Sequence, residues 1–598
     1  MSQDEQLPYY DVIIMGGGPA GATLGALLAR TTDLRIGLFE KEFFPREHIG
    51  ESMSHPLIPI LEESGALPKV LASDCWVQKY GGVFNWDDKE PKATFFDYQS
   101  WQEDGVYRWA FHINRAEFDH ILLDHAAACG VEVSQGVTVS KFDPEGDGCV
   151  VTLKDGRKVR GGYFVDASGR RNSIAARQKR NWLSDYRNIA IHNHFLGGRS
   201  VQDMPGDWNL FREEDLSPIG CFAFPDGWCW YIPVPMTLDG ERVLTHSVGI
   251  VTNPDVLKEP GRDFTDMDVF LRTIKQVPML ADLVQDATPV RDKVITNTNY
   301  SMINDRFADF DERWLLIGDA SYFVDPLFSS GVSFAANQAS SAALLLRETL
   351  GATLSEQDKR DLWTDYDENW HGMAETFSLA IDQWYHAIGK NQPGGIYWKS
   401  RGTTVDLNIQ ERTFQALLNT AVPPDLLLVM DSSGTGKVED LDRSGPFVRA
   451  NTMATSGEPH PDDVVVPAAG FTVRTGVGLD APGFKAVLPP PPFTIPPEYQ
   501  AAITKYWEDP VANGDKVPNP VGAPAPCHRF SLRDAPGLEV RGLDRQGAAE
   551  LLELLTGEEL TYGELLARLT FAQQQILKRL VRAGMVTSRA ATPQAEVA

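Results

Sequence analysis

The chain has 598 residues, more than one hydrophobic core supports, so two or three domains are expected. Hydrophobic residues make up 42% of the chain and charged residues 23%, a composition that excludes a largely disordered or fibrous protein. Asp and Glu number 82 against 55 Lys and Arg, and the net charge of −27 argues against nucleic acid and anionic membrane surfaces as partners.

The cysteines and the N-terminal segment indicate the compartment. Six cysteines lie scattered, without the short spacings of a zinc site, which is typical of a reducing compartment. The start of the chain is acidic where a signal peptide is basic, and no stretch approaches the roughly 18 apolar residues of a membrane span. We expect a cytoplasmic protein without a metal site or a membrane contact.

The first predicted elements form a βαβ unit. Residues 10–16 (YDVIIMG) are a short β-branched run that leads directly into glycines and then into the helical sequence PAGATLGALLAR. A second apolar run, RIGLFEK, covers residues 35–41. Strand, tight turn, helix and strand in this order predict the start of a doubly wound α/β sheet.

The glycines of this unit predict dinucleotide binding. Gly16, Gly18 and Gly21 in GGGPAG have the GxGxxG spacing, where a side chain would block the turn, the pyrophosphate or the contact between helix and sheet. Glu40 ends the second strand about 20 residues later, where a carboxylate can accept hydrogen bonds from the ribose hydroxyls.

The rest of the chain is predicted to contain further strands and helices, an antiparallel sheet and a C-terminal module. Strands and helices continue to about residue 180, and residues 190–300, rich in Trp, Phe and β-branched residues, predict an antiparallel sheet that faces the substrate. A buried strand at 313–321 leads into a helix of good propensity. A polyproline stretch at 488–499 predicts a stiff spacer before a final module of short helices.

Two later strands end in an aspartate, Asp166 in YFVDASGRR and Asp319 in WLLIGDAS. Either residue alone would more often be a helix cap. With the glycine turn, in this order, they resemble the FAD-binding fold shared by aromatic hydroxylases, geranylgeranyl reductases and flavin-dependent halogenases. This implies an α/β fold with a FAD-binding Rossmann-type domain of the GR2 (PHBH-like) class, an antiparallel β substrate domain and a helical C-terminal region. Arg46 and Arg115 then resemble the arginines near the flavin and its phosphates.

Three local sequences match flavin-dependent halogenases better than hydroxylases, and the first is a pair of tryptophans. Trp228, Trp230, Ile232 and Pro233 in GWCWYIPVP fit the WxWxIP signature, which the resemblance assigns to keeping substrate and flavin apart. A buried aromatic strand is the alternative interpretation of such a tryptophan pair.

The second motif is FVDPLFSSG, in which Phe323, Pro326, Ser329 and Gly331 fit the pattern FxxPxxSxG. Because this stretch opens a helix, backbone N–H groups at Ser330 and Gly331 can hold a halide beside the flavin. The predicted halide site therefore comprises Ser329, Ser330 and Gly331. The resemblance implies that FAD is bound by Gly16, Gly18, Ala20, Gly21, Glu40, Arg46, Ser52, Arg115, Asp166, Asp319, Pro326, Gly331 and Val332.

Lys79 lies in a KxGxxF context, VQKYGGVFNW, which matches the lysine of halogenases. Most single lysines are solvated surface residues. Here flanking aromatics and glycines favour burial, which would lower the pKa of the amine or let it donate a hydrogen bond in a dry tunnel. Lys79 is the predicted catalytic residue.

The resemblance covers about residues 8–420 and implies the chemistry. Reduced FAD from a separate flavin reductase reacts with O2, and chloride or bromide is oxidised to hypohalous acid. The acid travels through an internal tunnel to Lys79, which holds it by a hydrogen bond or as a haloamine and directs it at an electron-rich aromatic carbon.

One departure bears on the substrate. Tryptophan halogenases carry a glutamate where this chain has Phe328, so the sequence resembles the phenol and pyrrole branch, with substrate either free or tethered to a carrier protein. Asp325 is the position at which a covalent bond to the flavin would be sought. The alternatives are an NAD(P)H-dependent aromatic hydroxylase of the same fold and a catalytically inactive, flavin-carrying interaction protein.

The predicted domain boundaries follow these motifs. The FAD-binding domain comprises residues 8–190 and 301–350, and the substrate-facing β domain comprises residues 191–300. A helical C-terminal region at 351–480, a Pro-rich linker at 481–526 and a small helical, winged-helix-like module at 527–598 complete the chain.

Overall fold

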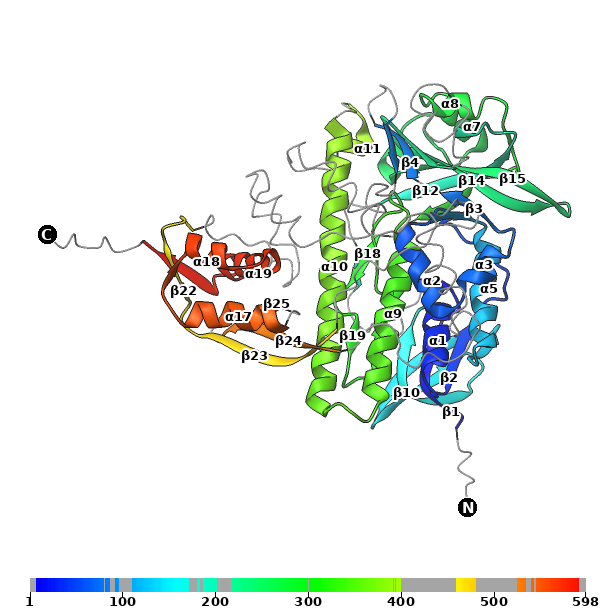
Figure 1. The fold of residues 1–598 in the computed structure, drawn as a ribbon. Helices are drawn as coiled ribbons and strands as arrows, with labels where there is room; N and C mark the ends of the chain where they lie inside the picture. Colours follow the sequence, from blue (N-terminus) through cyan, green and yellow to red (C-terminus); the bar gives the residue numbers. More distant parts are fainter. Residues whose placement is uncertain are drawn as a thin grey trace, which may run out of the picture.

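The computed structural model shows a large α/β body, a β domain at one end of it and a C-terminal module beside it (Figure 1). It describes residues 7–79, 81–86, 92–95, 110–170, 180–182, 187–201, 204, 217–298, 301–390, 392, 394–399, 459–479, 524–533, 539–542 and 545–590. In these ranges no helix is both long and apolar enough to cross a bilayer.

The α/β body is built on a sheet with the strand order β19-β20-β10-β1-β2-β7, to which β9 and then β8 are added beside β10. The central pairs β1–β2, β1–β10, β10–β20 and β2–β7 are parallel, and β1 is buried along most of its length. The strands are β1 (Tyr9–Met15), β2 (Ile36–Glu40), β7 (Glu132–Gln135), β8 (Val139–Glu145), β9 (Gly148–Leu153), β10 (Lys158–Asp166), β19 (Ala308–Asp309) and β20 (Trp314–Leu316). The predicted doubly wound α/β fold is confirmed.

Helices cover this sheet, and α1 packs between α5 and α9. Helix α10, 35 residues long, runs beside the shorter α9 and lies between the body and the C-terminal module (Figure 1). The helices are α1 (Pro19–Thr31), α2 (Ile58–Ser64), α3 (Leu67–Leu71), α5 (Arg115–Ala128), α9 (Gly331–Leu350), α10 (Glu356–Lys390) and α11 (Ile396–Lys399), with 3-10 turns η1 (His55–Leu57) and η5 (Gly318–Ala320).

The β domain is a second sheet, with the order β16-β12-β15-β14-β13-β4-β5 and β17 beside β12. It is antiparallel except where β13 pairs in parallel with β4, which comes from the N-terminal part of the chain. Its strands are β4 (Gly81–Asn85), β5 (Lys92–Phe95), β12 (Ile189–Leu196), β13 (Ile219–Phe224), β14 (Gly227–Leu238), β15 (Glu241–Thr252), β16 (Thr288–Pro289) and β17 (Ile295–Thr298). Short helices α6 (Pro254–Leu257), α7 (Met267–Ile274) and α8 (Leu280–Leu283) cover one end.

Two small sheets lie between these parts. Strand β3 (Trp76–Lys79) pairs with β6 (Ala110–Ile113), and β18 (Met302–Asn304) lies between β11 (Arg180–Trp182) and β21 (Tyr322–Phe323). One hydrophobic cluster runs without a break from Val12 of β1 through Ile232 of β14 to Leu345 of α9. The α/β body and the β domain therefore share a core.

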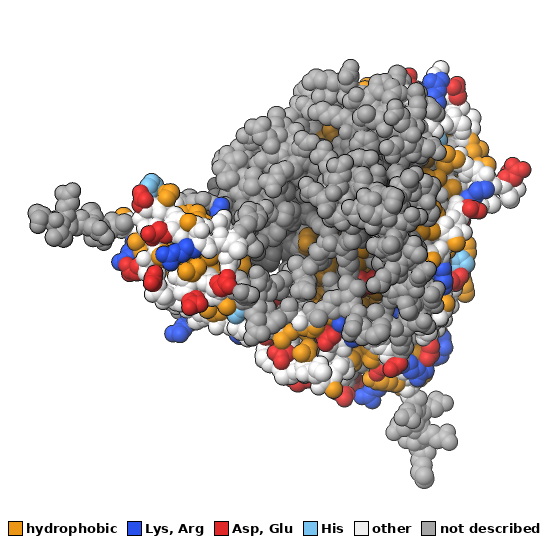
Figure 2. Space-filling model, viewed as in Figure 1, with side chains coloured by type: hydrophobic (Ala, Val, Ile, Leu, Met, Phe, Trp, Pro, Cys, Tyr) orange, Lys and Arg blue, Asp and Glu red, His pale blue; other side chains and the backbone are white. Residues whose placement is uncertain are grey.

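The C-terminal module has its own hydrophobic core, which includes Leu551, Leu565 and Leu577. Strands β22 (Val464–Pro467), β26 (Leu560–Thr561) and β27 (Val586–Arg589) form one small sheet, and β23 (Phe471–Gly478), β24 (Ala525–Leu532) and β25 (Glu539–Gly542) form another. Helices α17 (Arg545–Thr556), α18 (Tyr562–Arg568) and α19 (Phe571–Arg582) complete it. On the face in Figure 2, acidic and basic side chains are interspersed over this module.

The C-terminal boundaries differ from the predicted ones. Residues 464–478 form strands that pair with β24, β26 and β27, so the prediction of a helical region to residue 480 is wrong there. Their β-branched residues are stabilised by strands that follow far later in the sequence, which composition alone does not reveal. Residues 401–458 of that region and residues 481–523 of the predicted linker lie outside the described residues.

Candidate functional site

The glycine turn between β1 and α1 has the shape that a dinucleotide requires. Gly16 has a φ of +109°, and a Cβ on it would lie 2.4 Å from Ala167 O. A Cβ on Gly21 would lie 2.0 Å from Gly16 O, because α1 approaches the strand closely there. A Cβ on Gly18 would instead meet only Arg46 Nη2, at 3.6 Å, which leaves open space in front of the helix N-terminus.

Glu40 stands at this turn, at the end of β2. Its Oε2 accepts a hydrogen bond from Gly17 N at 2.7 Å, and its Oε1 accepts one from Glu42 N at 2.8 Å. The carboxylate is thereby held against the glycine loop, at the position from which a ribose is reached in dinucleotide-binding sheets.

The two predicted arginines lie in different environments. Arg46 is stacked over Phe44, lies beside Gly18 and approaches Asp119 Oδ2 to 4.0 Å. Arg115 is buried, donates to both oxygens of Asp119 at 2.8 and 2.9 Å, and also donates to the carbonyls of residues 49 and 50. Arg46 therefore faces the open space at the glycine turn, whereas Arg115 fixes the backbone that leads to Ser52.

The two aspartates also differ. Asp166 is fully buried at the end of β10, and its Oδ1 accepts hydrogen bonds from Ser168 N at 3.0 Å and Ser168 Oγ at 2.6 Å, as in a local turn. Asp319 lies in η5, with Arg170 Nε 3.6 Å from its Oδ2. Burial raises the pKa of Asp319, and Arg170 partly offsets that rise.

The Asp319 turn is packed against the start of two helices. Gly318 has a φ of +62°, and a Cβ there would lie 3.1 Å from Ala20 of α1 and 3.2 Å from Ala335 of α9. The glycine turn, the Asp319 turn and the N-terminus of α9, where Val332 is found, therefore converge. This arrangement of Gly18, Glu40, Arg46 and Asp319 fits an extended dinucleotide such as FAD.

Lys79 is the last residue of β3, and its side chain is 1% exposed. Its Nζ donates to Ser52 Oγ and to Met53 O, both at 2.8 Å. Burial lowers the pKa of Lys79 to about 7, with a small opposing contribution from Cys221. The amine is therefore divided between its charged and neutral forms at neutral pH.

The segment that carries the acceptors of Lys79 also reaches the predicted halide loop. Met53 N donates to Phe111 O at 2.9 Å, which ties the segment to β6, the partner of β3. Ser333 lies in the first turn of α9. Ser54 Oγ donates to Ser333 Oγ at 2.6 Å, and Ser333 Oγ lies 3.0 Å from Ser54 O. The lysine and the start of α9 are thus held to one stretch of backbone.

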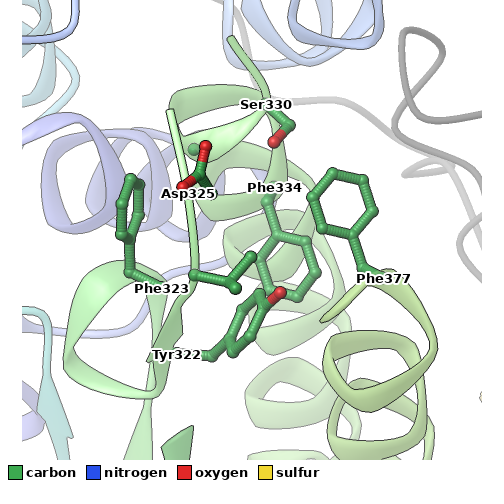
Figure 3. A pocket seen from close by; sticks show the side chains of 8 residues that line it. Tyr322, Phe323, Asp325, Ser330, Phe334 and Phe377 are labelled. Atoms are coloured by element: carbon green, nitrogen blue, oxygen red, sulfur yellow. The ribbon is translucent and has the colours of Figure 1, made fainter. Parts of the chain in front are cut away.

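The loop before α9 has a strained backbone and borders a small cavity. Ser329 has a φ of +58°, Ser330 is the N-cap of α9, and Pro326 O accepts a hydrogen bond from Ser329 N at 3.0 Å. Ser330 and Gly331 line a cavity of about 10 Å³, roughly what one water molecule needs. In Figure 3 the side chains of Asp325 and Ser330 lie above the rings of Tyr322 and Phe334, which form part of the same wall.

The tryptophans lie on one face of β14, since residues two apart share a face. Trp228 and Trp230 are 2% and 5% exposed, and their ring centroids are 6.1 Å apart. Ile232 and Pro233, which follow in the same strand, are also buried. The tryptophan indole nitrogens have separate partners: Trp228 Nε1 donates to Tyr385 Oη at 2.7 Å, and Trp230 Nε1 donates to Ser247 Oγ at 3.1 Å.

A buried ion pair that the motifs did not reveal lies next to Ser52. Glu51 Oε1 and His194 Nε2 are 2.5 Å apart. Burial acts to raise the pKa of Glu51, but the charge and hydrogen bond of His194 outweigh it, so this pKa lies below its ordinary value. Burial acts to lower the pKa of His194, yet Glu51 holds it above its ordinary value. Glu51 and His194 are 143 positions apart in the chain, so no sequence motif could indicate that they form a pair.

A larger cavity, of about 410 Å³, adjoins β3 directly before Lys79. Its wall includes Trp76 and Gln78 of β3, Pro233 of the WxWxIP motif and Tyr231 and His246. This volume lies within the range of pockets for small organic ligands. Among the residues that the structure describes, no group of three His, Cys, Asp or Glu is arranged to hold a metal ion.

Sequence comparison connects these features to known enzymes. Residues 91–245 match the family described as tryptophan halogenase. The 1H-pyrrole-2-carbonyl-[peptidyl-carrier protein] chlorinase of Pseudomonas fluorescens is 31% identical over 402 residues, which are 63% of this chain and 82% of that protein. The tryptophan 2-halogenase of Chondromyces crocatus is 28% identical over 398 residues, 65% of this chain and 70% of that protein.

Solved structures show the same fold. The myxobacterial chondrochloren halogenase CndH, an FAD-dependent halogenase, has a TM-score of 0.56 at 27% identity, over 73% of this chain and 92% of that one. The flavin-dependent halogenase CmlS has a TM-score of 0.66 at 22% identity and covers 98% of this chain and 96% of its own. The similarity to CmlS therefore extends into the C-terminal module.

Proposed function

The chain belongs to the flavin-dependent halogenases, and on this premise we propose that it halogenates an electron-rich aromatic ring in secondary metabolism, with Lys79 as the residue that delivers the halogen. FAD is the cofactor and halide a substrate, as in the family. When bound and reduced, FAD supplies the activation of O2 that converts halide into hypohalous acid.

The observation that carries the assignment of Lys79 is its buried amine with a pKa of about 7. The neutral amine can react with hypohalous acid to give a haloamine and water. The aromatic carbon then takes the halogen and gives up its proton, and that proton returns the nitrogen to the neutral amine. The protonated amine can alternatively donate a hydrogen bond to the acid and polarise it. Ser52 Oγ and Met53 O hold Nζ in place for either role.

We assign the remaining residues by their positions around this path. Gly16, Gly18, Gly21, Glu40 and Arg46 would hold the adenosine diphosphate part of FAD, because the open space at Gly18 faces Arg46. Ala20, Ser52, Arg115, Asp166, Asp319, Pro326 and Val332 would shape the flavin side, several of them through neighbouring residues.

For the halide we propose the cavity lined by Ser330 and Gly331, which follow Ser329 directly; Ser329 itself does not line it. The first N–H groups of a helix have no partner within the helix and carry a partial positive charge, which favours an anion. The buried indole rings of Trp228 and Trp230 would exclude the aromatic substrate from the flavin side, so that oxygen transfer to it is suppressed.

For the aromatic substrate we propose the 410 Å³ cavity, because it adjoins the strand that ends at Lys79. Phe328, buried where tryptophan halogenases carry a glutamate, favours a phenol or pyrrole. The similar chlorinase of Pseudomonas fluorescens acts on a pyrrole bound to a carrier protein, so a carrier-bound substrate is one of the two forms to test. Flavin-dependent halogenases need a flavin reductase, which we propose as the partner.

The test is mass spectrometry of the products formed with FAD, a flavin reductase, NADH, O2 and a panel of free and carrier-bound phenols and pyrroles, with chloride, bromide or neither. We expect a halogen isotope pattern on one ring. Lys79→Ala should abolish it while flavin oxidation continues, and Lys69→Ala, which removes an exposed lysine, should behave as the wild type. Addition of one oxygen without halide would instead identify a hydroxylase.

A further inference from the structure

The two halogenase motifs are joined by a residue that belongs to neither. Tyr385 lies near the C-terminal end of α10, 157 residues after Trp228 and 60 after Asp325. Its hydroxyl receives the hydrogen bond of Trp228 Nε1 at 2.7 Å and lies 2.9 and 3.0 Å from the two carboxylate oxygens of Asp325. The WxWxIP strand and the halide loop therefore meet at one phenol group.

The direction of this chain of hydrogen bonds follows from chemistry. An indole N–H only donates, and an ionised carboxylate only accepts, so the phenol must accept from Trp228 and donate its single proton to Asp325. Trp228 is 2% exposed, Tyr385 0% and Asp325 1%, so neither bond is in contact with bulk water. Loss of the hydroxyl would leave a buried donor without its acceptor and a buried carboxylate with one donor fewer.

Asp325 shapes the halide loop at its start. Its Oδ1 accepts a hydrogen bond from Leu327 N at 3.0 Å, a turn across Pro326, and its Oδ2 accepts one from Asn188 Nδ2 at 2.7 Å. Asp325 also lines the 10 Å³ cavity together with Ser330 and Gly331 (Figure 3). A buried carboxylate next to an anion site repels the anion unless hydrogen-bond donors take up its charge.

We propose that Tyr385 is a positioning residue for halide: its hydroxyl holds the Asp325 turn against the tryptophan strand and draws the charge of Asp325 away from the anion cavity. The inference rests on the proposed function, because it takes the cavity at Ser330 and Gly331 as the halide site. Tyr385 itself does not touch the reacting atoms. Tyr385→Phe keeps the ring that packs against Tyr397 and Trp398 and removes only the hydroxyl.

The experiment measures halide affinity without turnover. Oxidised, FAD-loaded protein is titrated with bromide at constant ionic strength, balanced with sulfate, and the flavin fluorescence is recorded. We expect Tyr385→Phe to raise the Kd for bromide roughly tenfold, the effect of one buried hydrogen bond to a charged group, with unchanged FAD affinity. In turnover, the KM for halide should rise while the KM for the aromatic substrate stays constant, and more H2O2 should escape per halogenated product.

Tyr397→Phe is the matched control. It removes a hydroxyl from the same aromatic cluster, but this hydroxyl donates to Asn188 Oδ1 at 3.3 Å, one step away from Asp325. Its bromide Kd should stay within about twofold of the wild type. Should Tyr385→Phe not fold, Trp228→Phe breaks the same chain at its other end, and an increased bromide Kd is expected there too.

Two outcomes would overturn the inference. One is a bromide Kd for Tyr385→Phe equal to that of the wild type, and the other is an equal increase in Tyr397→Phe, which would indicate general loosening of the cluster. Both differ from failure of the proposed function, in which the wild type itself forms no halogenated product.

Discussion

At the scale of the single residue, burial distinguishes Lys79 from an ordinary surface lysine. Burial removes water from the amine, so its charged form is disfavoured and its pKa falls to about 7. Two oxygen acceptors, Ser52 Oγ and Met53 O, remain in contact with it. The surrounding fold thereby prepares a nucleophile or hydrogen-bond donor that can change its charge near neutral pH.

This pKa predicts the pH dependence of halogen transfer. With a pKa of about 7 the amine is half deprotonated at pH 7, so the neutral fraction grows about tenfold between pH 6 and pH 8. If a haloamine forms, the product yield per flavin oxidised should rise by about that factor and then level off. Lys79→Arg, always charged, should oxidise flavin at the normal rate and yield no product at any pH. A yield that does not vary with pH would support the hydrogen-bonding role.

At the scale of the element, the turn between β1 and α1 holds glycines whose surroundings differ. Gly21 lies where α1 touches the turn, and any Cβ there would collide with Gly16 O. Gly18 has ordinary extended backbone, φ −68° and ψ −177°, and open space in front of it. The fold thus gives no reason for a glycine at position 18, and we propose that the bound pyrophosphate is the reason.

Alanine at these two positions should therefore have different effects. Gly18→Ala should fold with an unchanged melting temperature as apoprotein but bind FAD at least tenfold more weakly, because the methyl group occupies the approach of the pyrophosphate. Gly21→Ala should lower the melting temperature of the apoprotein itself. Thermal unfolding and FAD titration followed by fluorescence measure both. Wild-type FAD affinity in Gly18→Ala would argue against the pyrophosphate position.

At the scale of the whole molecule, the C-terminal module is held to α10 by paired arginines on neighbouring strands. Arg529 of β24 is 1% exposed and donates to Asp365 Oδ1 at 2.9 Å and to Glu368 Oε2 at 3.1 Å. Arg474, its cross-strand partner on β23, reaches Asp361 at 2.6 Å with a side chain that is 47% exposed. The module is thus fixed to the helix that also carries Tyr385.

The two arginines should contribute unequally to stability. Arg529→Met leaves the carboxylate of Asp365 buried with one cation fewer, which should cost about 3–5 kcal/mol. Arg474→Ala removes a pair whose arginine is half exposed although Asp361 is buried, and it should cost less, about 1 kcal/mol. Urea unfolding of the two variants measures the difference. Equal losses would mean that the buried pair does not anchor the module.

Local constraints account for what could be predicted from sequence. Glycine spacing, the length of the apolar runs and the motifs around Lys79, Trp228 and Pro326 depend on turn geometry and on neighbours in the chain, so they indicate the α/β fold, FAD and the halogenase family without coordinates. These predictions are confirmed by the fold and by the related proteins.

Only the tertiary structure decided how these local pieces work together. Ser52, Asp325 and Tyr385 lie 27 to 157 positions from the residues they hold, and Val464 pairs with Thr561 nearly a hundred residues later. Such partners are selected by packing, where burial and the loss of water decide which polar groups must meet, and no pattern within a short stretch of sequence records that choice. The sequence by itself therefore determined the chemistry that the chain carries, and the folded structure decided the arrangement that can direct it.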